Sequence, residues 1–178
     1  MSSAMMRRPA FTTLTHAECW ELLGRVHVGR LAFFNHGIVD IEPVNYVAKD
    51  SWLFLRSRRG TKLEVFTHHP YVAFETDEVR SDSDWESVVA HGTVYLLSAK
   101  SIGIDRAVYE RALRALRSYV PAAFTRDDPT PSRTVVYGIH VDHVTGRQAA
   151  RSRHVPRTRS RHMTRRRRAD VTMASDRA

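Results

Sequence analysis

The clearest chemical signal in the sequence is a basic turn, RSRRGTKL, that begins at Arg56 and lies between a predicted strand and a predicted helix. Free backbone N–H groups at the start of a helix face outward and attract anions. Gly60 permits close approach of a ligand, and the hydroxyls of Ser57 and Thr61 can donate hydrogen bonds. Arg56 and Lys62 add positive charge. The turn predicts phosphate binding, with a solvated basic turn as the alternative; because the GxxxxGK[ST] spacing is missing, nucleotide hydrolysis is not expected.

A proline within the preceding predicted strand marks a second candidate region, EPVNY, which begins at Glu42. Pro43 has no N–H to donate to a sheet, so it usually indicates an edge strand or a place where the ladder opens. An open ladder would leave backbone groups free to contact a flat ligand. The residues alone leave both interpretations open.

The other reactive side chains do not form a recognisable site. His140 and His143 are three residues apart on a predicted strand, where such residues face opposite sides. The sequence has neither an HExxH motif nor a pair of cysteines, so we expect no metal site. Cys19 lies on a predicted helix and is expected to pack in the core.

Six strands and three helices are predicted to position these regions. The first helix begins with a capping box, in which Thr15 and Glu18 satisfy each other's backbone donors, and it ends near Gly24. An amphipathic helix is expected over residues 104–120, with Pro121 as its stop. The predicted strands are VHVGRLAFF, IVDIEPVNYVA, WLFLRS, YVAFETDEV, WESVVAHGTVYLL and RTVVYGIHVDHV, with a short helix at residues 61–67. The order αβββαββαβ favours a mainly β fold, with an antiparallel sheet closed into a small barrel and short helices in the gaps.

Length and charge distribution predict one domain with two extensions. The chain has 178 residues, a mass of 20.4 kDa and a net charge of +9. Residues 1–146 hold equal numbers of basic and acidic residues, so the excess charge lies in the arginine-rich C-terminal segment. We expect an N-terminal arm at 1–13, a folded domain at 14–147 and a disordered tail at 148–178. The sequence contains no apolar run long enough to span a membrane, no apolar leader and a single cysteine, so a cytoplasmic protein without disulfides is predicted.

Five motifs, taken in order along the chain, resemble the pyridoxamine 5′-phosphate oxidase-like flavoprotein family, the FMN-binding split barrels. The motifs are GRLAFF, IVDIEPVNYV, WLFLRSRRGTKL, VAFETDEV and WESVVAHGTVYLL, and the resemblance covers residues 14–147. It implies a split barrel of antiparallel, Greek-key type. It also implies a homodimer with FMN at the interface between the subunits.

The resemblance assigns three groups of residues to the cofactor. In the family, one segment runs beside the isoalloxazine ring, and it matches Pro43, Val44, Asn45 and Tyr46. Another segment holds the FMN phosphate, and it matches Arg56, Ser57, Thr61 and Lys62. A third segment reaches the pocket across the dimer interface, and it matches Trp85, Ser87 and Val88.

The function that the resemblance implies is that of an FMN-dependent oxidoreductase, in which N5 of the flavin takes a hydride from, or gives it to, a small molecule. No side chain need act as acid or base, although Tyr46 or His91 could donate a proton. Vitamin B6 oxidases of the family carry a C-terminal arginine and histidine that contact the vitamer. The present chain becomes arginine-rich beyond Gly146, so that role is not carried over.

Other functions stay open at this point. The domain could bind FMN, a deazaflavin coenzyme or haem without turnover, because relatives of each kind belong to the family. The segment 148–178 could bind the phosphates of RNA or DNA without sequence specificity, or it could be a solubilising extension. Neither interpretation of the tail involves a membrane.

Overall fold

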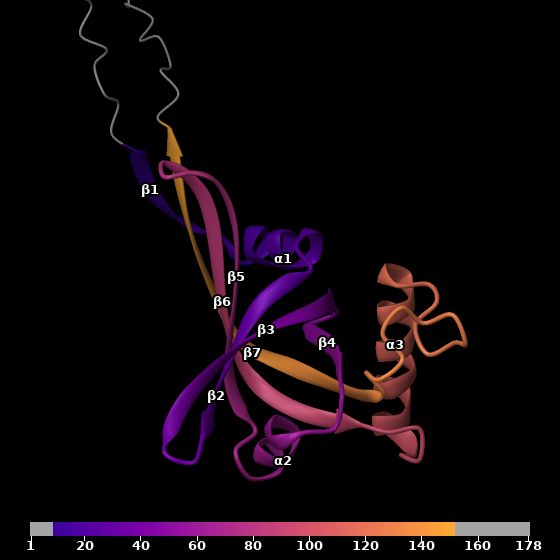
Figure 1. Ribbon diagram of the computed structural model, residues 1–178. Helices are drawn as coiled ribbons and strands as arrows, with labels where there is room; N and C mark the ends of the chain where they lie inside the picture. The colour runs from indigo at the N-terminus through magenta and orange to yellow at the C-terminus, as the bar shows by residue number, and fades with distance from the viewer. Residues whose placement is uncertain (1–8, 152–178) are drawn as a thin grey trace, which may run out of the picture.

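The computed structural model describes residues 9–151, which form a seven-stranded antiparallel sheet and three helices (Figure 1). The strands are β1 (Pro9–Leu14), β2 (Val28–Asn35), β3 (Ile38–Lys49), β4 (Trp52–Ser57), β5 (Tyr71–Ser81), β6 (Asp84–Leu97) and β7 (Val135–Arg151). The helices are α1 (His16–Arg25), α2 (Thr61–His68) and α3 (Gly103–Tyr119).

Strand β7 closes the sheet into a barrel. Neighbouring strands follow the order β1-β7-β4-β3-β2-β5-β6, and β7 also pairs with β6. The first part of β7 pairs with β4, from Val135 opposite Ser57 to His140 opposite Trp52, whereas its last part pairs with β1. One long strand therefore takes part in the barrel and continues beyond it. The predicted mainly β fold with short helices is confirmed.

Strand β1 is an element that the sequence pattern did not predict. It lies almost entirely in the segment expected to be an arm, and it pairs with residues 146–151 of β7. The same part of β7 runs past residue 147, where the folded domain was expected to end. Neither segment has a clear apolar period. Strand β1 forms because it pairs with β7, and this part of β7 is also paired on its other side with residues 85–88 of β6.

Helix α1 begins where the capping box predicts. The backbone N–H and the hydroxyl of Thr15 donate to Glu18 Oε2, each at 2.7 Å, and Glu18 N donates to Thr15 Oγ1 at 3.3 Å. The inner face of the helix buries Cys19, Leu22 and Leu23. Cys19 therefore packs in the core, as expected.

Two apolar clusters hold the fold together. The larger fills the barrel with side chains such as Leu53, Phe74 and Ile139, and helix α2 adds its own buried face to it. The smaller lies outside the barrel, where α3 packs against Phe54 of β4 and Val136 of β7. Figure 1 shows α3 beside β4, with α2 at the lower end of the barrel and α1 farther up. The start of α2 and the outer face of β3 are thereby fixed relative to one another.

Gly92 lies at a shift in the β6–β7 register and has no room for a side chain. A Cβ at this position would clash with the backbone carbonyl oxygen of His140, which cannot easily move. We expect Gly92→Ala to lower the free energy of unfolding by roughly 1–3 kcal/mol, measured by urea denaturation. Gly24→Ala is the matched control, because a Cβ there meets no atom within 4 Å and alanine should stabilise α1 by about 0.5–1 kcal/mol. Equal effects of the two substitutions would contradict this packing.

Candidate functional site

The start of α2 offers backbone donors to open space. Gly60 is the residue that precedes the helix, and it provides no side-chain cap. A Cβ added at Gly60 would meet no atom within 4 Å, so the space in front of the helix is open. Thr61, the first helical residue, is exposed, and Ser57 ends the preceding strand with a half-buried side chain. The arrangement fits an anion such as a phosphate group, because the first N–H groups of a helix have no partner within the helix.

Arg56 is not free to serve this anion site in the structure. Its guanidinium donates to both carboxylate oxygens of Asp128, at 2.5 and 3.0 Å, and to Thr130 Oγ1 at 2.8 Å. The side chains of Arg56 and Asp128 are only 8% and 2% exposed. Phe124 covers the guanidinium, with its ring centre 5.2 Å from Arg56 Cζ. Arg56, which the sequence predicted to bind phosphate, thus links the loop after α3 to β4 through Asp128 and Thr130.

The other cations of the basic turn differ in their contacts. Lys62 Nζ lies 2.7 Å from Glu42 Oε2, and the lysine side chain is 16% exposed. Arg58 and Arg59 are exposed, and neither forms an ion pair within residues 9–151. Sequence analysis named Lys62 as a phosphate ligand but did not assign a role to Arg58 or Arg59. Their charge and their position just before α2 were the sequence features that could have indicated a role in phosphate binding.

The side chains of the proline-containing segment of β3 alternate between two faces. Val44 and Tyr46 point into the barrel and are 9% and 1% exposed, whereas Pro43 and Asn45 are exposed. Arg133 Nη1 donates to Asn45 Oδ1 at 3.1 Å, which leaves the two N–H groups of the Asn45 amide to face other partners. Only Pro43 and Asn45 can therefore present side chains to a ligand on the outer face. Val44 and Tyr46 could contribute backbone atoms alone.

Tyr46 is unsuited to the proton transfer that the sequence suggested for it. Its hydroxyl is buried in the barrel and has no hydrogen-bond partner within the part of the chain that the structure describes. Burial raises the pKa of Tyr46 to about 12. Tyr46 therefore cannot donate a proton to a ligand on the outer face, contrary to the expectation from the sequence. His91, the other suggested donor, is exposed on β6 opposite Ala73 and His143.

A charged network lies beside Pro43 on the outer face of the sheet, and sequence analysis missed it. Arg30 pairs with Pro43 across β2 and β3, and its guanidinium contacts both Asp77 and Glu75, the latter at 3.4 Å. Ser87 Oγ donates to Glu75 Oε1 at 3.1 Å. Burial, followed by the nearby Asp77 charge, raises the pKa of Glu75. The network links the Pro43 segment to Ser87, a predicted cofactor residue, across two strands.

Trp85 lies far from the basic turn within one chain. It is near the tip of the β5–β6 hairpin, where it pairs with Ala149 of β7 and packs against Phe11, with ring centroids 6.2 Å apart. Arg56 instead pairs with Val136 of the same strand. At about 3.3 Å per residue, the two β7 partners are roughly 40 Å apart along the strand. One chain alone therefore does not bring Trp85 to the basic turn, and Val88 points into the core.

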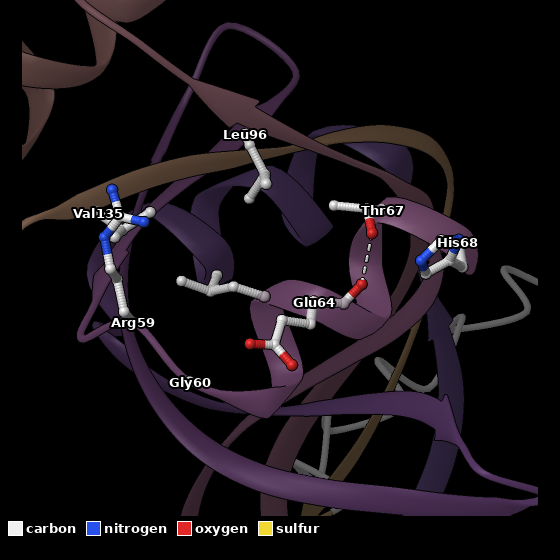
Figure 2. A pocket seen from close by; sticks show the side chains of 8 residues that line it. Arg59, Gly60, Glu64, Thr67, His68, Leu96 and Val135 are labelled. Atoms are coloured by element: carbon white, nitrogen blue, oxygen red, sulfur yellow. Dashed lines mark hydrogen bonds between the residues drawn. The ribbon is translucent and has the colours of Figure 1, made fainter.

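A groove with a volume of about 580 Å³ runs along α2, and Figure 2 shows it from close by. Arg59 and Gly60 lie at its start and His68 at its far end, and Leu96 of β6 points into it from above. Glu64 and Thr67 line the side formed by the helix, as the labels show. The remaining lining residues are Leu63 and Val135. The groove begins at the open anion site.

Residues 9–151 contain neither a cluster of metal ligands nor a membrane-spanning helix. The structure has no group of three or more His, Cys, Asp or Glu side chains in this range that could hold a metal ion. In the same range, no helix combines the length and apolar character needed to cross a membrane.

A family model described as pyridoxamine 5′-phosphate oxidase matches residues 15–148. The chain belongs to this family. The matched range contains α1, the barrel strands β2 to β6, α2, α3 and all but the last residues of β7. None of the curated proteins compared with the chain matches it.

Solved structures of similar proteins agree with this membership. An FAD-binding protein from Mesorhizobium loti shares 27% identity and a TM-score of 0.63, over 80% of this chain and 98% of that one. The FAD-binding protein from Mycobacterium smegmatis shares 25% identity and a TM-score of 0.57, over 77% of this chain and 98% of that one. An FAD- and haem-binding protein from the same organism, at 12% identity, shares the fold with a TM-score of 0.57, over 77% of this chain and 73% of that one.

Proposed function

We propose that the protein binds a flavin nucleotide and acts as an oxidoreductase on a small molecule. The observation that carries the proposal is the open, uncapped start of α2, with two unpaired arginines before it, on a chain of this family. The names of the two similar FAD-binding proteins support a flavin as the ligand. The resemblance found in the sequence favours FMN as its form.

In this proposal the phosphate of the flavin lies at the start of α2. The N–H groups of the first helical turn and the Thr61 and Ser57 hydroxyls would donate to it, and Lys62 would add a charge-assisted hydrogen bond. Arg58 and Arg59 are exposed cations beside the same site. Arg56 would act indirectly, by holding the 128–130 segment through its contacts with Asp128 and Thr130.

The ring of the flavin is proposed to lie on the outer face of β3. Pro43 offers a flat apolar surface without an N–H, and the Asn45 amide, oriented by Arg133, can donate to a polar edge of the ring. A bound flavin supplies hydride transfer at its N5 atom. The protein side chains bind and orient the ring, and His91, exposed on the outer face of β6, is the remaining candidate for proton donation.

Two copies of the chain are proposed to form the complete site. The outer face of β2, β3 and β5 exposes large apolar side chains, a feature typical of interaction surfaces. These side chains are Val28, Phe34, Val39, Ile41 and Tyr71, at 46% to 78% exposure. Because one chain separates Trp85 from the basic turn, a partner subunit would have to deliver Trp85, whereas Ser87 lies in the charged network beside Pro43 of its own chain. The site would then lie at the subunit interface, with two sites per dimer.

Ile41→Arg is expected to convert the dimer into a monomer and to weaken flavin binding. Ile41 is 66% exposed on the apolar face, so arginine would place an unpaired charge at the interface. Light scattering after size-exclusion chromatography measures the mass, and fluorescence titration measures the flavin affinity. Ile104→Arg is the matched control, since Ile104 is 83% exposed on α3, away from this face. A dimer that survives Ile41→Arg would contradict the proposed interface.

The oxidoreductase activity is tested by anaerobic reduction of the flavin-loaded protein. NADH or NADPH is mixed with the protein, the visible flavin absorbance is followed, and air or a nitroaromatic acceptor is then admitted. Loss of the absorbance followed by its return is the expected result. A flavin that no donor reduces and no acceptor reoxidises would favour a carrier or sensor without turnover.

The remaining predictions concern location and the tail. A cytoplasmic location stays a prediction. Nucleic-acid binding by residues 148–178 also stays a prediction, because residues 152–178 lie outside the described part of the chain. Deazaflavin and haem are the alternative ligands of the same domain, and identification of the bound chromophore separates them from a flavin.

A further inference from the structure

The groove along α2 is larger than a single phosphate requires. Its volume of about 580 Å³ lies within the range of about 300–1,000 Å³ that is typical of small-molecule sites. Helix α2 has eight residues, so the groove extends about 12 Å from its start to its end. A flavin whose phosphate lies at Gly60 would therefore have an open path along the helix for a second part of the nucleotide.

The order of side chains along the groove matches the order of groups in an adenine nucleotide. Arg59 stands at the start, where a second phosphate would follow the first, and it is free of ion pairs within residues 9–151. The carboxylate of Glu64 comes next, and such a group accepts hydrogen bonds from ribose hydroxyls in other dinucleotide sites. In Figure 2, Glu64 lies between the labels of Gly60 and Thr67.

The far half of the groove suits a flat base. Leu96 gives this half an apolar surface and the His68 ring stands at its end, whereas Val135 lies beside Arg59 at the other end of the groove. Thr67 Oγ1 donates its hydrogen to the Glu64 carbonyl oxygen at 2.6 Å. The Thr67 oxygen can therefore act only as an acceptor, which fits the exocyclic amino group of adenine.

We propose that the groove binds the adenosine half of FAD, so that the flavin held by this chain is FAD rather than FMN. This inference rests on the proposed flavin site at the start of α2. A second cavity, of about 400 Å³, lies between α2 and the β2–β3 turn, and it shares Glu64 and His68 with the groove. The second cavity lacks Arg59 and the apolar surface from β6 and β7, so it fits a diphosphate and a base less well.

The test compares FAD and FMN binding to three forms of the full chain. Leu96→Trp fills the groove from an exposed strand position, since Leu96 is 45% exposed. Ile104→Trp is the matched control, because Ile104 is 83% exposed on α3 and does not line the groove. Flavin fluorescence titrations give the two affinities, and circular dichroism and thermal unfolding check that each variant is folded.

The unaltered chain is expected to bind FAD at least tenfold more tightly than FMN. Leu96→Trp should remove this preference and leave the FMN affinity unchanged, while Ile104→Trp should keep both affinities. Equal affinities for FAD and FMN, or a preference for FAD that survives Leu96→Trp, would overturn the adenosine site and leave flavin binding standing. Loss of FMN together with FAD in Leu96→Trp would place the ring rather than the adenosine in the groove and would also overturn it. Failure of the unaltered chain to bind either flavin would overturn the proposed function itself.

Discussion

Lys62→Ala is expected to lower the affinity of the protein for flavin by roughly 10- to 100-fold. A hydrogen bond to a charged group contributes about 1.5–3 kcal/mol, which corresponds to this change in the dissociation constant. The substitution also leaves the Glu42 carboxylate, now 2.7 Å from Lys62 Nζ, without its partner beside the proposed phosphate site. Both effects act against a dianionic ligand. Fluorescence titration with FMN and FAD measures the change.

Two variants separate the phosphate contact from general effects of charge. Lys49→Ala removes an exposed lysine whose nearest acidic group is Asp50, at 3.9 Å, and it should leave the affinity unchanged. Glu42→Gln should keep or slightly increase the affinity, because Lys62 loses a competing carboxylate. A wild-type affinity in Lys62→Ala would remove Lys62 from the site, whereas a loss in Lys49→Ala would show that net charge alone is responsible.

Asp128→Ala is expected to lower Tm by on the order of 10 °C. The substitution leaves the Arg56 guanidinium in a closed environment without its bidentate partner. It also removes the acceptor of two backbone N–H groups. Phe124 N donates to Asp128 Oδ2 at 2.7 Å, and Thr130 N donates to Asp128 Oδ1 at 2.8 Å. Differential scanning calorimetry measures the change. Asp127→Ala is the control, because Asp127 is exposed, and a Tm that falls equally in both variants would contradict the buried clamp.

The same ion pair predicts how stability depends on pH. The Arg56 guanidinium, with the N–H groups of Phe124 and Thr130, holds the pKa of Asp128 well below its usual range. A depressed pKa in the folded state stabilises the protein above the pKa of the unfolded chain, about 4, and this contribution is lost as the pH falls toward the folded pKa. Urea denaturation from pH 7 to pH 3 should show a decline below pH about 4 that Asp128→Asn reduces. An identical decline in both proteins would assign it to other carboxylates.

The fold could be predicted from the sequence because its signals are local. The capping box at Thr15 fixes the start of α1, and the β-branched runs separated by turns fix the barrel strands. Strand β1 escaped prediction because PAFTTL has no period of its own. It is a strand only because residues 146–151 of β7 lie beside it.

The candidate site could be predicted only in part. The partner of Arg56 is 72 residues away in the chain, on a loop whose path no local pattern predicts. The opposite directions of Asn45 and Tyr46, in contrast, follow from the two-residue period of a strand. Because Val44 and Tyr46 share the face that points into the core, this period excludes the Tyr46 side chain as a ligand on the outer face.

The charged network around Arg30 illustrates a second limit. Its members come from β2, β5 and β6, and they meet only because Arg30 lies opposite Glu75 and Asp77 opposite Ser87 in the sheet register. The sequence shows the acidic run of β5 but not the strand that lies beside it. Pairing of distant strands is therefore the information that the motifs lacked.

The visible absorption spectrum of the freshly purified full-length protein tests the central claim most directly. Heat release and chromatography then identify any chromophore and its amount. We predict a flavin spectrum, with about one flavin released per subunit, recovered as FAD if the α2 groove holds adenosine. A colourless protein that takes up neither FMN nor FAD when they are added would contradict the account.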